Sequence, residues 1–114
     1  MTGVSGDEWI AAWNSHDLER ILSHYAEDVV FHSPASTRIT GDVSGRVVGK
    51  PALRAYWGEA LRRAPDLTFT KLKEFRGAGG LAIHYLSSRT GGEVVEVLRF
   101  GADGLAVEAS AYYE

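Results

Sequence analysis

The feature that most constrains the fold is the C-terminal half of the chain, where glycine-containing breaks separate four strand-like runs. The runs cover about residues 67–76, 81–90, 93–100 and 105–113. Glycine supplies the positive φ that tight hairpin connections need, and the runs are rich in β-branched and aromatic residues. This pattern predicts a mostly antiparallel sheet built as a meander.

Helical signals are confined to the first 64 residues. Ser5 and Glu8 have the spacing of a capping box, in which the serine hydroxyl accepts from the Glu8 amide and the Glu8 carboxylate reaches back. The helix that follows is expected to break at residues 14–17. Asp17 or Ser15 then caps a second short helix, whose apolar positions extend to Tyr25.

A short strand is predicted at residues 29–33, ended by Pro34. Residues 35–48 are expected to form a loop with some strand near its end, and a third helix is expected to run to about residue 64, with Pro51 in its first turn. Three helices followed by a meander predict an α+β domain over residues 1–114, with the helices packed on one face of a curved sheet.

Composition excludes several classes of protein. The net charge of −3 and the scattered Lys and Arg residues argue against a nucleic-acid-binding face. The absence of cysteine removes disulfides and thiolate metal sites. No apolar run is long enough to span a membrane, and the first eight residues lack the features of a secretory signal. We therefore expect a cytoplasmic protein without a bound metal.

Side-chain alternation along the predicted hairpins divides the sheet into two faces. With a two-residue turn at Gly91-Gly92, Ser87 pairs with Glu96; an even last turn pairs Leu98 with Val107. The inner face then collects Ile83, Tyr85, Ser87, Val94, Glu96, Leu98, Phe100, Leu105, Val107, Ala109 and Ala111. The outer face collects His84, Leu86, Val95, Val97, Arg99, Glu108, Ser110 and Tyr112, and its apolar members predict a homodimer interface.

Glu96 is the one acid predicted on the apolar inner face. An ionised carboxylate there must be paired, hydrated or protonated, because burial disfavours the charged form. One interpretation is structural: Glu96 pairs with Arg89 or lies at a hydrated rim. The other is functional: Glu96 is a pocket acid with a raised pKa that gives or takes a proton.

Several segments resemble the nuclear transport factor 2-like superfamily, which includes ketosteroid isomerase and the SnoaL-like polyketide cyclases. The segments are residues 13–18, 25–31, 49–53 and 97–100, and the likeness covers essentially the whole chain. The resemblance implies a cone-shaped α+β barrel with an apolar pocket between the helices and the sheet. The superfamily contains many chemistries, so the fold alone does not identify a reaction.

The resemblance to ketosteroid isomerase places its three functional positions on Ser33, Trp9 and Glu96. Ser33 stands where the general-base aspartate is expected, so the carboxylate is missing. Trp9 stands where the oxyanion-hole tyrosine is expected, so the phenol hydroxyl is missing. Glu96 stands where the protonated aspartic acid is expected, and side-chain alternation also places it on the apolar inner face. The sequence therefore does not predict a steroid isomerase.

What the resemblance implies is a SnoaL-like domain that binds a compact, apolar carbonyl or hydroxyl compound and needs no cofactor. Glu96 and Ser33 are the predicted catalytic residues; the predicted ligand contacts are Trp9, Trp13, Phe31, Tyr56, Trp57, Tyr85 and Leu98. His32 or His84 would enter the pocket only if the strand registers shift. The alternative is a non-catalytic ligand-binding or dimerisation module.

Overall fold

The computed structural model describes residues 3–114; Met1 and Thr2, the first residues of the predicted domain, lie outside the described residues. The helical elements are α1 (Gly6–Ser15), α2 (Leu18–Leu22), the 3-10 turn η1 (Pro34–Ser36), α3 (Thr37–Thr40) and α4 (Lys50–Arg63). The strands are β1 (Tyr25–His32), β2 (Arg46–Val48), β3 (Phe69–Gly77), β4 (Gly80–Ser87), β5 (Glu93–Phe100) and β6 (Ala106–Tyr113).

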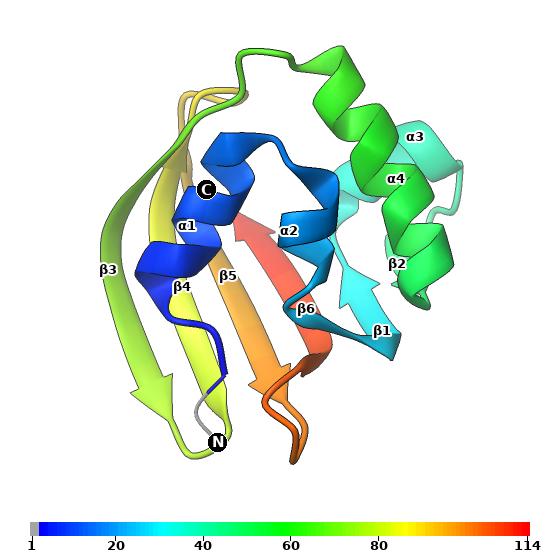
Figure 1. Cartoon of the computed structure of the whole chain (residues 1–114). Coiled ribbons are helices and arrows are strands. Elements are labelled where there is room, and N and C mark those ends of the chain that lie inside the picture. The colour runs from blue at the N-terminus through cyan, green and yellow to red at the C-terminus, as the bar shows by residue number, and fades with distance from the viewer. Residues whose placement is uncertain (1–2) are drawn as a thin grey trace.

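The six described strands form one curved sheet in the order β2-β1-β6-β5-β4-β3. Strand β1 runs parallel to β6, and every other neighbouring pair is antiparallel. Helices α1, α2 and α4 lie on one side of this sheet (Figure 1). This arrangement confirms the predicted α+β cone fold, since the helices and the inner face of the sheet share one apolar core.

The first two helices begin where the sequence predicts. The Ser5 hydroxyl accepts the Glu8 amide at 3.1 Å, and Asp17 accepts the Arg20 amide at 3.2 Å. The predicted return contact of the capping box, from the Glu8 carboxylate back to Ser5, is wrong. The Glu8 carboxylate binds the Arg20 guanidinium at 2.9 Å and the His24 ring, because these cations offer it a charge-assisted contact.

The second helix and the following loop differ from the prediction. Tyr25, predicted as a helical position, is the first residue of β1 and is fully buried. The segment predicted as a loop contains the short elements η1 and α3, with Ser33 as the N-cap of η1. Neither element is long enough to show a helical period of apolar residues, which explains why the pattern missed them.

The β4–β5 register also differs: Ile83, not Ser87, lies opposite Glu96. The connection is longer than two residues because Gly91 donates its amide to the Ser87 carbonyl and closes a wider turn. The pairing therefore moves by an even number of residues. An even shift keeps each side chain on its face, so the predicted inner and outer faces of these strands are correct.

The β5–β6 register moves as well, with Leu98 opposite Ala109 rather than Val107. An irregularity next to Phe100 places Ala106 in the core, while Val107 is only partly buried. Arg99 lies directly opposite Glu108, and their side chains pair at 3.4 Å on the outer face.

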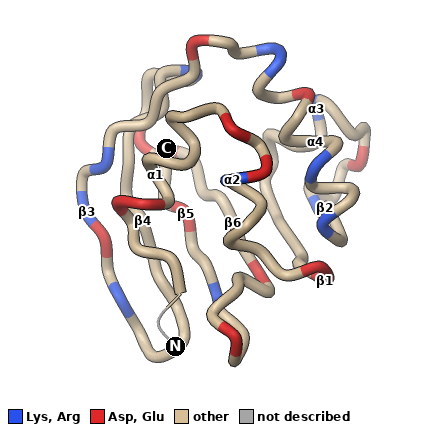
Figure 2. Tube along the Cα trace, in the orientation of Figure 1, with Lys and Arg blue, Asp and Glu red and all other residues tan. Residues whose placement is uncertain are grey.

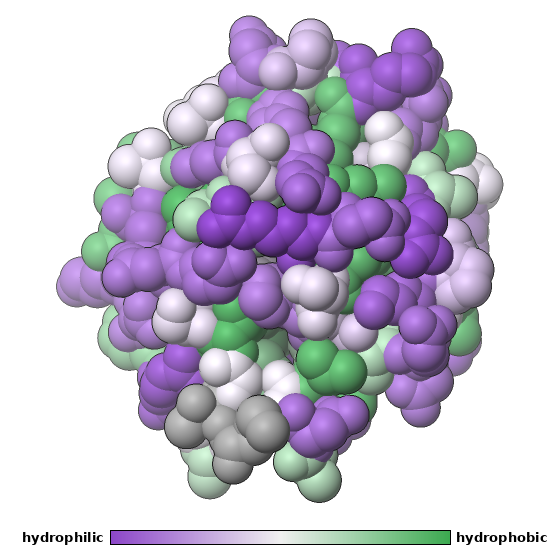
Figure 3. All heavy atoms as spheres, in the orientation of Figure 1, coloured by the Kyte–Doolittle hydropathy of each residue, from purple (hydrophilic) through white to green (hydrophobic). Residues whose placement is uncertain are grey.

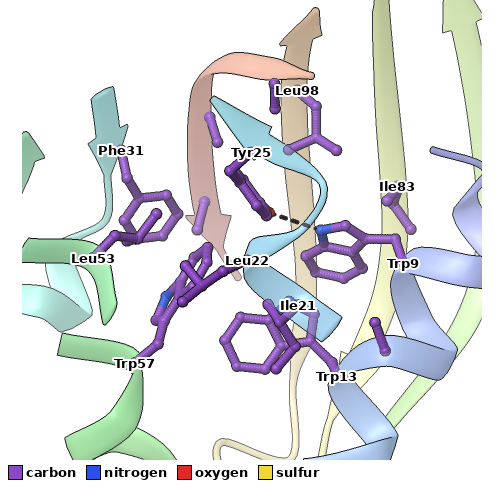
Figure 4. Close-up of a cluster of buried hydrophobic side chains, with 14 of the residues drawn as sticks. Trp9, Trp13, Ile21, Leu22, Tyr25, Phe31, Leu53, Trp57, Ile83 and Leu98 are labelled. Atoms are coloured by element: carbon purple, nitrogen blue, oxygen red, sulfur yellow. Dashed lines mark hydrogen bonds between the residues drawn. The ribbon is translucent and has the colours of Figure 1, made fainter. Parts of the chain in front are cut away.

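The core combines side chains from α1, α2, α4 and the inner face of the sheet, including Leu22, Leu53, Ile83 and Leu98 (Figure 4). Acidic and basic residues are interspersed along the chain (Figure 2), and hydrophilic residues cover much of the face in Figure 3. Among residues 3–114, no helix is long and apolar enough to cross a membrane.

Candidate functional site

A cavity of about 280 Å³ lies between the helices and the inner face of the sheet. Aromatic and aliphatic side chains dominate its wall, as is usual for small-molecule sites. Its lining comprises Trp9, Trp13, Phe31, Ala35, Arg38, Ile39, Tyr56, Trp57, Ala60, Arg63, Ala64, Leu67, Phe69, Tyr85, Ser87, Arg89, Glu96, Ala111 and Tyr113.

All three tryptophans of the chain lie on this wall. Trp9 and Trp13 come from α1, at a spacing that places both on the face toward the sheet, and Trp57 comes from α4. The Trp13 and Trp57 rings meet edge to face with centroids 4.9 Å apart, and Trp9 stacks on Phe69 at 5.8 Å. These contacts fix the rings, so the cavity wall is preformed.

Glu96 is the only acid among the described lining residues, and the residue is 3% exposed. It projects from the middle of β5, between Ile83 on β4 and Ala111 on β6. The Tyr85 hydroxyl donates to Glu96 Oε1 at 3.3 Å. No Lys, Arg or His within residues 3–114 forms an ion pair with Glu96.

Burial raises the pKa of Glu96 to about 8, against the smaller opposing effect of the hydrogen bond from Tyr85. The carboxyl group therefore keeps its proton at neutral pH. Because Tyr85 occupies Oε1 as a donor, Oε2 can carry that proton and donate it to a ligand. Burial and the neighbouring Glu96 also raise the pKa of Tyr85, which stays a neutral phenol.

Two further buried donors belong to this region. The Trp9 indole N–H donates to the Tyr25 hydroxyl at 2.9 Å, a bond that ties α1 to β1 (Figure 4). The Trp13 indole N–H is buried and has no acceptor among residues 3–114. Buried polar groups without a partner are rare in folded proteins. The Trp13 indole N–H is therefore an exception among the described residues, and it is closed off from the cavity space.

The structure brings together most of the side chains that the sequence selected as ligand contacts. Six of them line the cavity: Trp9, Trp13, Phe31, Tyr56, Trp57 and Tyr85. Leu98 is buried in the core and does not line the cavity. Arg89 lies at the cavity but does not pair with Glu96, so the ion-pair interpretation of Glu96 is wrong for the described residues.

Ser33 does not share the cavity wall with Glu96. Its hydroxyl accepts the Ala35 amide at 3.2 Å and lies 3.4 Å from the Tyr113 hydroxyl, which does reach the cavity. His32 faces a separate open hollow, and His84 binds Glu93 on the outer face. Neither histidine lines the cavity, so the alternative that places one of them beside Glu96 is wrong.

Sequence reasoning missed Tyr113, Arg38 and Ile39 as cavity residues. Tyr113 lies two residues after Ala111, and side chains two residues apart on a strand share a face, so the same alternation predicts it on the inner face. Arg38 and Ile39 come from α3, where the sequence carried no periodic signal. Residues 3–114 contain no group of three or more His, Cys, Asp or Glu side chains arranged to hold a metal ion.

Comparisons with known proteins agree with this architecture. Residues 7–109 match the model of the SnoaL-like domain. A SnoaL-like protein of unknown function from Burkholderia thailandensis is 46% identical, with a TM-score of 0.91 over 96% of this chain and 90% of that chain. A search of curated proteins gave no significant match.

More distant structures share the fold alone. A candidate ketosteroid isomerase from Kribbella flavida is 19% identical, with a TM-score of 0.71 over 95% of this chain and 73% of that chain. A candidate polyketide cyclase from Sinorhizobium meliloti is 14% identical, with a TM-score of 0.74 over 93% and 91% of the two chains. With the family model spanning most of its length, this chain belongs to the SnoaL-like family, within the nuclear transport factor 2-like superfamily.

Proposed function

We propose that this protein binds a compact apolar carbonyl or hydroxyl compound and that Glu96 acts on it as a cofactor-independent acid. The observation that carries the proposal is a buried carboxyl group, without an ion pair among residues 3–114, on the wall of an aromatic cavity. With a pKa of about 8, Glu96 holds a proton at neutral pH and can still exchange it. A structural acid in a filled core would have no cavity in front of it.

The ligand oxygen would be held by the donors that the wall supplies. Glu96 Oε2 is the donor proposed to meet a carbonyl oxygen. The Trp13 indole N–H, which is buried and has no acceptor among residues 3–114, would join it once its ring turns toward the ligand. Because the surrounding wall is largely apolar, hydrogen bonds from these groups are stronger there than in water and stabilise developing negative charge on that oxygen. Glu96 is thus the proposed proton donor and Trp13 a proposed oxyanion donor.

In this proposal Ser33 is a positioning residue that acts through Tyr113. Its hydroxyl lies within 3.4 Å of the Tyr113 hydroxyl and fixes where that ring meets the cavity. Ser33→Ala should therefore weaken ligand binding modestly and leave the pH dependence of turnover unchanged. A shift in the pH profile would give Ser33 a direct part in proton transfer.

Deuterium exchange tests the proposed chemistry without knowledge of the natural substrate. Compact cyclic ketones such as indanone and tetralone are incubated with the protein in deuterated buffer, and NMR follows loss of the protons next to the carbonyl. In this exchange Glu96 donates to the carbonyl oxygen while solvent that enters through the cavity opening takes the α proton, and deuterium returns from solvent to the same carbon. We expect faster exchange with wild-type protein than with Glu96→Gln, and a decline in the Glu96-dependent part as the pH rises past about 8. Glu108→Gln, on the outer face, is the matched control. Equal rates for wild-type and Glu96→Gln would refute the acid role.

A non-catalytic ligand-binding module is the second candidate. The observation that favours it is the absence of any histidine or second carboxylate among the described lining residues, so the wall offers no separate base. Binding of the same ketones with no exchange above the buffer rate would select this candidate.

We further propose that the outer face of the sheet joins two copies of the chain. Val95, Val97 and Tyr112 are 36%, 41% and 61% exposed there and lie on adjacent strands. On β4, β5 and β6 the charged side chains of this face are paired with one another, His84 with Glu93 and Arg99 with Glu108. Such a partly apolar surface suits a self-complementary contact. Sedimentation at micromolar concentration should show a dimer that Val97→Lys dissociates; a wild-type monomer would refute it.

A further inference from the structure

The charged residues of the cavity are distributed unevenly. Glu96 is its only acid and is buried, whereas Arg38, Arg63 and Arg89 are exposed and line its outer part. The whole chain has a net charge of −3. The entrance to the cavity is therefore locally basic on a protein that is acidic overall. These three arginines define what we call the basic mouth.

The basic mouth is assembled from three separate elements. Arg38 belongs to α3, Arg63 to the last turn of α4, and Arg89 to the turn after β4. The end of α4 and the β4–β5 turn lie at the same end of the molecule (Figure 1), and both carry basic segments there (Figure 2). Residues distant in sequence thus place positive charge around one opening.

Two of these arginines lack the carboxylate partner that most other arginines among residues 3–114 have. Arg63 binds Glu59 at 2.7 Å, as Arg54 binds Glu19 at 2.9 Å. Neither Arg38 nor Arg89 forms an ion pair with a carboxylate of residues 3–114. The Arg89 guanidinium instead lies 5.6 Å from the centre of the Tyr113 ring, which also lines the cavity.

We propose that the ligand is an amphiphilic carboxylate: its apolar body fills the aromatic cavity and its carboxylate binds Arg38 and Arg89 at the mouth. A guanidinium presents a planar fork of donors that matches a carboxylate, and such charge-assisted bonds are stronger than neutral ones. Both side chains are exposed and line the same cavity, so one anion at the mouth is proposed to bind both. This inference rests on the proposed function, and it specifies the chemical class of the molecule that the cavity takes.

The inference also gives the ligand an orientation. A carboxylate held at the mouth directs the opposite end of the molecule toward Glu96, the buried acid of the wall. A carbonyl or hydroxyl group at that far end would meet the donors of the cavity. The preferred compound is therefore a keto or hydroxy acid in which an apolar ring separates the two polar ends.

A matched pair of probes tests the charge requirement directly. Naphthylacetate and naphthylacetamide have the same apolar body and differ in the charge of one group. Isothermal titration calorimetry at neutral pH and low salt should show that wild-type protein binds the acid about tenfold or more tightly than the amide. The preference should shrink at high salt, because the arginines are exposed.

Substitutions at the mouth identify the residues responsible. The double variant Arg38→Gln, Arg89→Gln should bind acid and amide with equal affinity and keep the wild-type affinity for the amide. Arg62→Gln is the matched control, because Arg62 is an arginine of α4 that pairs with Glu59 and does not line the cavity. It should retain the full preference for the acid.

The outcomes separate the two proposals. Equal binding of both probes by wild-type protein, or an acid preference that survives the double variant, would overturn the carboxylate inference and leave the ligand-binding cavity standing. Binding of neither probe at millimolar concentration would overturn both proposals. Loss of the preference in the double variant but not in Arg62→Gln would support both.

Discussion

Replacing Glu96 by glutamine should change how the stability of the protein depends on pH. Burial raises the pKa of Glu96 from its ordinary 4.5 to about 8. Between these values the unfolded chain releases the proton and the folded chain keeps it. The unfolded state then binds fewer protons, so the free energy of unfolding falls as pH rises. The contribution is fully present below pH 4.5 and is lost as pH rises through 8.

The magnitude follows from the size of that pKa change. Each pH unit in which the two states differ by one proton corresponds to about 1.4 kcal/mol. Wild-type protein should therefore lose about 4 kcal/mol relative to Glu96→Gln between pH 5 and pH 9. Glutamine has nearly the same shape and cannot ionise, so other titrating groups cancel in the comparison.

Urea unfolding followed by tryptophan fluorescence measures this difference at each pH. The free-energy difference between the two proteins should grow steadily in favour of Glu96→Gln as pH rises. Glu108→Gln, which changes an exposed carboxylate on the outer face, should track the wild-type slope. A constant difference between wild-type and Glu96→Gln, or one that grows in favour of wild-type, would refute the protonated state of Glu96.

Three further perturbations test other parts of the structure. Tyr25→Phe removes the buried acceptor of the Trp9 indole N–H and should cost about 1–3 kcal/mol of unfolding free energy in urea titrations, whereas no loss would mean that water replaces Tyr25. Ser5→Ala removes the N-cap of α1 and should cost about 1 kcal/mol by the same assay; Ser5→Gly, costing only a few tenths, is its control. Hydrogen bonds from Arg20 and a neighbouring histidine lower the pKa of Glu8 to about 2. Its stabilisation is present above pH 4.5 and lost as pH falls through 2, so wild-type and Glu8→Gln should converge in acid, and parallel curves would contradict the pairing.

Much of the site was predictable because alternation along a strand survives errors in pairing. The β4–β5 register was wrong by an even number of residues, yet Tyr85 and Glu96 stayed on the inner face. Helical spacing likewise placed Trp9 and Trp13 on the buried face of α1. These periodic signals depend only on local geometry, so a single sequence was enough to assign side chains to the inner face.

The mouth of the cavity was not predictable from the same signals. Arg38 lies on a helix too short to show a period, and its approach to the cavity depends on how α3 packs on α4. Ser33 was selected by resemblance, but its hydroxyl is occupied in capping η1. Tyr25 was assigned to a helix because an apolar residue fits either period in a short segment. Tertiary packing decides each of these positions.

The most direct test of the central claim is a carbon-13 NMR titration of the Glu96 side-chain carboxyl, assigned by comparison with Glu96→Gln. We predict a midpoint near pH 8 in the ligand-free protein, because this carboxyl is buried and has no ion-pair partner among residues 3–114. A midpoint at or below about 4.5 would show that the group is hydrated or ion-paired, and would contradict a protonated acid on the cavity wall.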